Sequence, residues 1–423
     1  MTTRKSPHSL EGRGSDSDSR DLKSVELFSG AGGMALGLHG AGFTHLGLLE
    51  NNADACETLR RNIELATNHT VSRANVFQED VQQSSYDRFG PVDLLAGGVP
   101  CQPFSSGGKR LGHKDSRDMF PEFVRAVREL RPRCFLVENV RGLLWPRQAQ
   151  YFSYVKLQLR LPHVQRAESE KWMSHRVRLE QLSDTPDQIA QSYSVLAQVL
   201  NAADFGVPQC RERVFIVGLR NDSNQDWSFP EPTHSLEALL REQWITGEYW
   251  KRHGLKKPQR VPSELLSEIK ALELAPPDGL KPWVTIRDAI ADLPPPSRTT
   301  GARNGHVLVP GARRYPGHTG SVMDRPAKTL KAGVHGVPGG ENTVVLPNGR
   351  VRYFTIREAA RLQSFPDNWE FCGQWSATIR QLGNAVPSAI VRIVGARLAA
   401  LLKKETCRAA AEAPIAERRA PAA

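Results

Sequence analysis

The chain of 423 residues lacks several patterns that would assign it directly to a class of protein. Its cysteines form no C-x-x-C pair, and its 12 histidines show no H-E-x-x-H or comparable ligand spacing. This distribution predicts neither a disulfide framework nor a zinc site. The six cysteines are Cys56, Cys101, Cys134, Cys210, Cys372 and Cys407.

Long apolar segments are also missing. No uninterrupted apolar run reaches 18 residues, and the N-terminal stretch MTTRKSPHSLEGRGSDSDSR has no apolar core of a secretory signal. We therefore expect a soluble intracellular protein that does not enter a membrane. Residues 1–21 and the Ala/Pro/Arg-rich residues 405–423 are expected to be disordered tails, because they cannot bury enough apolar surface to offset the entropy of ordering.

Positive charge, by contrast, is in excess. Lys and Arg total 56 against 45 Asp and Glu, which gives a formal charge of +11 and a pI of about 9.5. Such a balance favours a polyanionic partner such as nucleic acid, although many basic proteins bind none. With 39% hydrophobic residues, the chain can form one large core and a smaller second domain.

Short apolar runs alternate with helical patterns in the first half of the chain. MALGLHGAG and MFPEFVRAVRELRPR have the character of helices, one ended by glycines and the other by a proline. This alternation predicts an α/β fold with a doubly wound parallel sheet. The expected strands are residues 24–28, 44–50, 92–98, 134–140 and 213–219.

The composition changes near residue 221. Residues 221–350 are rich in proline, glycine and basic residues, and we expect a second domain of loops and short strands. A helical pattern returns at residues 385–404. Residues 151–195 are polar and interrupted, which is typical of an insertion or a helical hairpin.

The stretch ELFSGAGGMALG follows the first expected strand and opens a helix. Gly30, Gly32 and Ala35 fit G-x-G-x-x-[G/A], and Glu50 lies twenty residues beyond Gly30. Such a loop lets the backbone approach a ligand closely while the carboxylate accepts ribose hydroxyls. A dinucleotide and S-adenosylmethionine both fit, and a ligand-free turn is the alternative. Asp80, beyond a third weak strand, is a candidate for an adenine amino group or a solvated loop acid.

The stretch GGVPCQPFS places one thiol between two prolines. Pro100 and Pro103 fix the backbone on either side of Cys101, so the loop can aim the sulfur. The loop also leaves the C-terminal end of an expected parallel strand, where ligands bind in open α/β sheets. We therefore predict that Cys101 is a nucleophile, active as its thiolate, and that the other five cysteines are structural.

Polar residues follow two further strands. Glu138 ends the apolar run CFLVENV, where a carboxyl group is costly unless paired or protonated. That setting fits a group that holds a proton for a substrate nitrogen, although a helix cap or an ion pair is the alternative. Arg211 and Arg213 alternate in FGVPQCRERVF, so they point the same way and are candidates to clamp a phosphate or a base carbonyl.

Six stretches occur in a specific order: ELFSGAGG, GGVPCQPFS, FLVENVRGLL, FGVPQCRERVFIVG, DRPAKTL and REAARLQSFPD…RQLGNAVP. Together they closely resemble the motif series of DNA (cytosine-5) methyltransferases of the bacterial restriction–modification type. The match covers most of residues 24–220 and 324–400. The resemblance implies a Rossmann-like catalytic and cofactor-binding domain at residues 22–220 and a smaller, loop-rich target-recognition domain at 221–350. Residues 351–404 would then be a hinge and a C-terminal segment that returns to the catalytic domain.

The resemblance also implies an activity: methyl transfer from S-adenosyl-L-methionine to C5 of a flipped-out cytosine within a short specific duplex sequence. Cys101 would attack C6 of the base covalently. Glu138 would contact N3 and the exocyclic amine, Arg213 the base carbonyl, and Arg211 would support the loop and Glu138. The cofactor would be lined by Phe28, Gly30, Gly32, Glu50, Asn51, Asp80, Val81, Pro100, Asn384 and Val386.

The implied partner is double-stranded DNA, read in the major groove by basic loops of the second domain. No metal and no obligate protein partner is expected, and a monomer suffices because one chain carries every motif. The implied setting is the bacterial cytoplasm, at the nucleoid, in an enzyme that protects DNA from a cognate restriction endonuclease.

Three rival functions are weighed against this one. An NAD(P)-dependent oxidoreductase would share the glycine loop but has no use for the Pro-Cys-Gln loop. A catalytically inactive DNA-binding relative would not need every catalytic residue, and all are present. A relative acting on tRNA should have a more compact recognition region.

Overall fold

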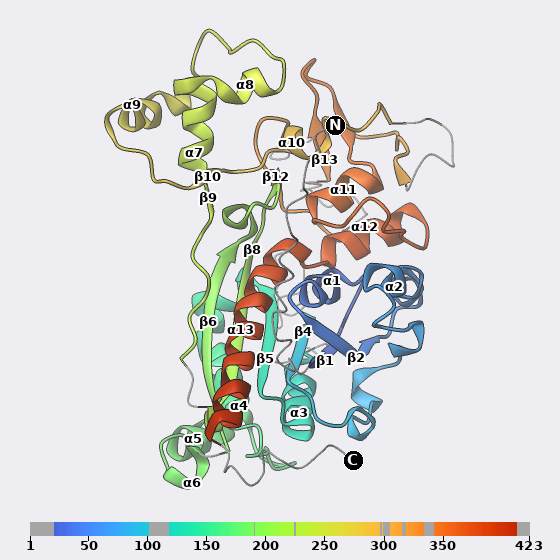
Figure 1. Ribbon diagram of the computed structural model, residues 1–423, viewed down its shortest axis with the longest axis vertical. Coiled ribbons are helices and arrows are strands. Elements are labelled where there is room, and N and C mark those ends of the chain that lie inside the picture. The colour runs from blue at the N-terminus through green and yellow to red at the C-terminus, as the bar shows by residue number, and fades with distance from the viewer. Residues whose placement is uncertain are drawn as a thin grey trace, which may run out of the picture.

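A seven-stranded sheet forms the centre of the molecule (Figure 1), with the strand order β3-β2-β1-β4-β5-β8-β6. The structure is a computed structural model that describes residues 21–100, 118–189, 191–223, 226–296, 298, 305–314, 319–333 and 342–412. Cys101 and most of both expected tails lie outside these described residues. The strands are β1 (Leu22–Leu27), β2 (Phe43–Glu50), β3 (Val76–Gln78), β4 (Leu94–Gly98), β5 (Cys134–Val140), β6 (Tyr193–Asn201) and β8 (Glu212–Arg220).

The sheet is parallel from β3 to β5, but β8 runs antiparallel to both of its neighbours. The prediction of a wholly parallel sheet was therefore wrong for β8. Strand β6 was not predicted, because its edge position exposes every second residue; only its first three residues fall in the segment 151–195 that was predicted as an insertion or hairpin. The reversal has a consequence for the site: the start of β8 lies at the same edge as the ends of the parallel strands.

Helices cover both faces of this sheet. Alternate residues of β5 enter different cores: Phe135 and Val137 pack with α3 and α4, whereas Cys134 and Leu136 pack with α1 and α13. The predicted helix in MFPEFVRAVRELRPR is confirmed as α3, and its Pro121 lies in the first turn, where no backbone N–H is needed. The helices are α1 (Gly33–His39), α2 (Ala53–Ala66), α3 (Phe120–Leu130), α4 (Ala149–Arg160) and α13 (Ser388–Glu412).

The segment between β5 and β6 is mostly helical. After α4 come α5 (Trp172–Leu182) and α6 (Pro186–Ile189), at the opposite end of the long axis from α8 and α9 in Figure 1. Helices α4 and α5 are joined by a buried hydrogen bond of 2.9 Å between Tyr154 Oη and His175 Nδ1. The predicted helical hairpin is thus present, and the chain continues from it into β6, which begins at Tyr193.

Residues 221–350 contain more helix than the sequence predicted. The helices were missed because each spans only five to nine residues, too few to show a clear period. They are α7 (Leu236–Leu240), α8 (Glu248–Arg252), α9 (Leu266–Leu274) and α10 (Ile286–Ile290). The short strands are β9 (His234–Ser235), β10 (Lys281–Pro282), β11 (Ser321–Val322), β12 (Ala327–Lys328) and β13 (Thr343–Val345), and β14 (Val351–Tyr353) follows just beyond residue 350. Strand β12 pairs with β7 (Gln209–Cys210), which lies before β8.

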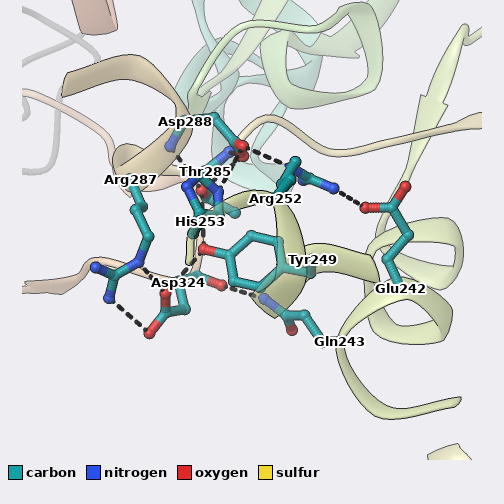
Figure 2. Close-up of polar contacts among 9 residues, drawn as sticks. All are labelled: Glu242, Gln243, Tyr249, Arg252, His253, Thr285, Arg287, Asp288 and Asp324. Atoms are coloured by element: carbon teal, nitrogen blue, oxygen red, sulfur yellow. Dashed lines mark hydrogen bonds and ion pairs between the residues drawn. The ribbon is translucent and has the colours of Figure 1, made fainter. Parts of the chain in front are cut away.

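A polar network fixes α8 and the π-helical turn Arg241–Thr246, which follows α7, to the segment that precedes β12, as Figure 2 shows. Asp324 Oδ1 accepts hydrogen bonds from Tyr249 Oη at 2.8 Å and from Arg287 Nε at 2.6 Å. The backbone oxygen of Asp324 accepts another from Gln243 Nε2 at 2.7 Å. The network continues through Glu242, Arg252, His253, Thr285 and Asp288.

The chain finally returns to the sheet through α11 (Ile356–Leu362), α12 (Trp375–Asn384) and α13. The last helix begins at Ser388, directly after Pro387, rather than at the predicted residue 385. The stretch Trp375–Thr406 has the length and mean hydropathy, 1.7, of a membrane span, but 61% of its most apolar window is buried inside the molecule. A core helix of this kind meets the same criteria, and α13 packs against α1.

Candidate active site

A cleft of about 490 Å³ opens at the C-terminal edge of the parallel strands. The structure brings together there all of the predicted site residues except Gly32, which does not line it, and Cys101, which lies outside the described residues. Those that line the cleft are Phe28, Gly30, Glu50, Asn51, Asp80, Val81, Pro100, Glu138, Arg211, Arg213, Asn384 and Val386. They come from the ends of the five parallel strands, from the start of β8, and from the end of α12 and the turn that follows it.

The glycine loop and Glu50 are held together by backbone hydrogen bonds. Glu50 Oε2 accepts from the Gly30 amide at 2.9 Å, and Oε1 accepts from the Asn52 amide at 2.8 Å. Each carboxylate oxygen has a second lone pair, so Glu50 can still accept the two hydroxyl groups of a ribose. A side chain at Gly30 would meet no atom within 4 Å, so the loop leaves open space above its backbone.

Gly32 has a packing role instead. Its φ of +88° belongs to the left-handed region, and a Cβ there would lie 2.6 Å from Leu59 Cδ2 and 3.0 Å from the Trp369 ring. Glycine is therefore required where the loop passes over α2.

Asp80 lies at the other end of the cleft, beyond β3, where its Oδ1 accepts a hydrogen bond from the Gln82 amide at 3.0 Å.

The turn between α12 and α13 meets the glycine loop in a direct backbone contact. A Cβ on Gly33 would lie only 2.3 Å from the carbonyl oxygen of Val386. A Cβ on Gly383 would lie 2.3 Å from the amide nitrogen of Ala332. Gly33 and Gly383 thus allow the turn between α12 and α13 to pack between the glycine loop and the segment that follows β12.

Glu138 occupies the end of β5 with its side chain 8% exposed. Burial raises its pKa, and the nearby positive charges of Arg213 and Arg211 only partly oppose this. Arg213 Nε lies 3.0 Å from Glu138 Oε1, the distance of an ion pair. Because β8 is antiparallel to β5, Arg213 at its start is carried to the same edge as Glu138 at the end of β5.

Arg211 hydrogen-bonds to the backbone of two distant segments. Its Nη1 donates to the carbonyl oxygen of Leu330 at 3.1 Å, and its Nη2 donates to that of Gly383 at 2.9 Å. The side chain is buried at the floor of the cleft and its charge reaches Glu138. Arg211 therefore joins three segments that are far apart in the sequence.

Sequence reasoning missed several lining residues. Asn139 is buried, and its Nδ2 donates to the carbonyl oxygen of Val99 at 3.2 Å, which ties the end of β5 to the start of the Pro100 loop. Glu26 lies near the end of β1, and an acid within the apolar run SVELF was the signal that could have identified it. Others are Asp54, Met119, Ala377, Arg380 and Gln381. Within the described residues no cluster of His, Cys, Asp and Glu could hold a metal ion.

The chain belongs to the C-5 cytosine-specific DNA methylase family, whose profile it matches over residues 22–160 and 173–400. The resemblance seen in the motifs is thereby confirmed. The protein is a DNA (cytosine-5) methyltransferase that depends on S-adenosyl-L-methionine. The cleft fits that cofactor, since the glycine loop leaves space, Glu50 keeps free lone pairs and Glu26 presents a buried carboxyl group without a partner among the described residues.

Curated relatives and solved structures agree with this assignment. The Type II methyltransferase M.NgoMIV of Neisseria gonorrhoeae is 31% identical and covers 90% of this chain and 98% of its own. M.Eco47II of Escherichia coli is 33% identical, with 90% and 79% covered. A prophage-encoded E. coli protein described as a DNA modification methyltransferase matches with a TM-score of 0.51 at 22% identity, covering 90% and 99%. The Dnmt2 methyltransferase of S. pombe matches with 0.53 at 18% identity and the same coverage. These structures share the α/β methyltransferase fold.

Proposed function

We propose that the cleft is where the cofactor and a flipped-out cytosine meet, and that its residues have the roles inferred from the motifs. The observation that carries the proposal is that the glycine loop with Glu50 and the Glu138–Arg213 pair line one cavity at neighbouring strand ends. One group suits a ribose, and the other suits the hydrogen-bonding edge of a base. A base inside the duplex cannot reach this depth, so it has to leave the stack.

In the proposed mechanism Cys101 attacks C6 of the cytosine as a thiolate. Asn139 supports this assignment, because it holds the carbonyl of Val99 and so fixes the direction in which the chain enters the Pro100–Cys101 loop. Glu138 is assigned the hydrogen bond to N3, a proton-donating role that the upward shift of its pKa by burial favours, and it offsets the charge that develops on the ring. Arg213 contacts the base carbonyl. S-adenosyl-L-methionine supplies the electrophilic methyl group when bound. Loss of the C5 proton and release of the Cys101 thiolate then restore the ring.

Arg211 acts as a positioning residue in this scheme. It holds the backbone of Leu330, in the RPAKTL segment, and that of Gly383, next to Asn384. We assign residues 221–350 to target recognition, with the Asp324 network orienting α8 and the turn Arg241–Thr246. The Type II names of the relatives support a role as the modification enzyme of a restriction–modification pair, acting as a monomer on nucleoid DNA in the bacterial cytoplasm.

The decisive experiment uses methyl-labelled S-adenosylmethionine, mixed-sequence duplex DNA, and the wild-type protein beside Cys101→Ser. We expect 5-methylcytosine confined to one short sequence, none with the variant, and covalent trapping of the wild type on a 5-fluorocytosine duplex. Turnover by Cys101→Ser would contradict the assignment of the nucleophile. Label on tRNA and none on DNA would contradict the assignment of the recognition region.

A further inference from the structure

Glu26 has no role in the mechanism above, yet it lines the cleft with a residue exposure of only 1%. Among the residues that the structure describes, none hydrogen-bonds to its carboxyl group; the Ser29 hydroxyl donates to its backbone oxygen instead. Its Oε2 atom is buried without a partner. A buried carboxyl group without a partner is strongly disfavoured as an anion, so this group is neutral unless a cation reaches it.

In the described part of the chain, the surroundings of Glu26 hold no cation that fulfils this role. Its neighbours in the sheet are Leu48 on β2 and Ala96 on β4, both apolar, and Met34 of α1 lines the same part of the cleft. Burial raises the pKa of Glu26 well above its ordinary value, and the negative charge of Glu50 raises it further. The other charged groups that line the cleft are Asp54, Glu79, Asp80 and Glu138, with Arg211, Arg213 and the exposed Arg380.

The position of Glu26 indicates which ligand would bring the cation. The strand order β2-β1-β4-β5 places it between Glu50, which suits the ribose, and Glu138, which suits the target base. The part of the cofactor between its ribose and the base site carries the methionyl chain. That chain ends in an α-carboxylate and an α-ammonium group, and only the ammonium can donate hydrogen bonds to a carboxylate, since a sulfonium has no N–H to donate.

We propose that Glu26 binds the α-ammonium group of the cofactor and releases its own proton to solvent as the ligand enters. The carboxylic acid becomes a carboxylate, N–H···O hydrogen bonds form to the ammonium, and one proton leaves the complex; no covalent bond changes. The inference rests on the cleft being the cofactor site, as proposed above.

The test is isothermal titration calorimetry at pH 6.5 in two buffers that differ in ionisation enthalpy. S-adenosylhomocysteine carries the ammonium group without the sulfonium, and methylthioadenosine lacks the whole amino-acid chain. At pH 6.5 an α-amino group, with a pKa of about 7.7–8.0, is charged. We expect the wild type to release close to one proton with S-adenosylhomocysteine and none with methylthioadenosine.

Glu26→Gln should release no proton and should bind S-adenosylhomocysteine between about 10-fold and 100-fold more weakly, the usual effect of losing a charge-assisted hydrogen bond. Its affinity for methylthioadenosine should stay within about twofold, since that ligand never meets the group. Asp54→Asn is the matched control, because it removes a carboxylate from the same cleft but should leave the proton release unchanged. Melting temperatures establish that both variants are folded.

Two results would overturn the role of Glu26: no proton release by the wild type with S-adenosylhomocysteine, or equal weakening of both ligands by Glu26→Gln. Proton release that persists in Glu26→Gln would assign the proton to another group. If neither ligand binds to the wild type, the cleft is not the cofactor site, and the proposed function fails together with this inference. If Glu26→Gln does not fold, the two-ligand comparison on the wild type can still overturn the proposal, because it requires proton release with S-adenosylhomocysteine and none with methylthioadenosine.

Discussion

Single residues in this protein divide into those that meet substrates and those that hold other residues in place. Glu138 and Arg213 belong to the first group, because both present charge to the cleft. Arg211 and Asn139 belong to the second, because each donates hydrogen bonds to backbone carbonyl oxygens. Residue type alone could not separate Arg211 from Arg213, since the distinction depends on segments more than a hundred residues away.

Glu138→Gln should lower the rate of methyl transfer by about 10²- to 10⁴-fold, the range of a lost general acid, while DNA affinity is retained. Glutamine keeps the shape of the side chain but cannot hold the proton that N3 needs. The measurement is a single-turnover rate beside a DNA-binding titration. A rate near that of the wild type would mean that Glu138 is structural.

The same assignment fixes the sign of the pH dependence. Burial raises the pKa of Glu138, so the acid stays protonated to a higher pH than an exposed glutamate. The wild-type rate should therefore fall as pH rises through this raised pKa, and the residual rate of Glu138→Gln should lack that step. An identical profile in both proteins would assign the step to another group.

At the scale of elements, the sequence predicted the strands well and their directions less well. Five strands were found because their apolar runs are continuous, as buried strands require. The direction of β8 could not be predicted, because an apolar run has the same composition whichever way it is paired. The short helices α7 to α10 were missed for want of a full amphipathic period.

One buried histidine ties β1, β2 and α1 together beneath the glycine loop. His45 Nε2 donates to the carbonyl oxygen of Ala35 at 2.9 Å, so its Nδ1 is the acceptor for the Ser24 hydroxyl at 3.0 Å. Complete burial lowers the pKa of His45 from 6.5 to about 4. The unfolded chain therefore binds a proton more readily, and stability is lost as pH falls from 6.5 toward 4.

His45 alone should reduce the free energy of unfolding by about 2 kcal/mol between pH 7 and pH 5, at about 1.4 kcal/mol for each pH unit. His45→Gln, which can still donate to Ala35, should show a smaller decrease in stability over this range. Denaturant titrations at the two pH values measure the difference. Equal decreases in both proteins would contradict the role of His45.

Gly383→Ala tests the contact between the turn after α12 and the segment after β12. The added methyl group would lie 2.3–2.6 Å from backbone atoms of Lys331 and Ala332, so backbone has to move and carry Asn384 with it. We expect weaker S-adenosylhomocysteine binding by at least about tenfold, or 1.4 kcal/mol. Gly40→Ala is the matched control, because its nearest contact is the flexible side chain of Arg392 at 3.1 Å. Equal affinities in the two variants would contradict the coupling.

At the scale of the whole molecule, the sequence predicted that the end of the chain returns to its beginning, since the GNAVP motif was assigned to the cofactor site. The physical reason emerges only in three dimensions. The backbone at Val386 touches Gly33, and α13 buries its apolar face against α1 and the sheet. A cofactor cleft completed by residues far apart in the chain can form only after most of the protein has folded.

The net charge of +11 leads to the last prediction. A duplex bound across the cleft should displace counterions as basic side chains meet its phosphates, so DNA affinity should fall steeply with salt. For about six phosphate contacts the loss between 50 and 200 mM salt is on the order of 10³-fold. Methylthioadenosine is uncharged, so its affinity should change little over the same range and serves as the control. A flat salt response for DNA, with cofactor-site binding intact, would mean that recognition depends on contacts other than phosphates and would contradict the basic surface as the docking face.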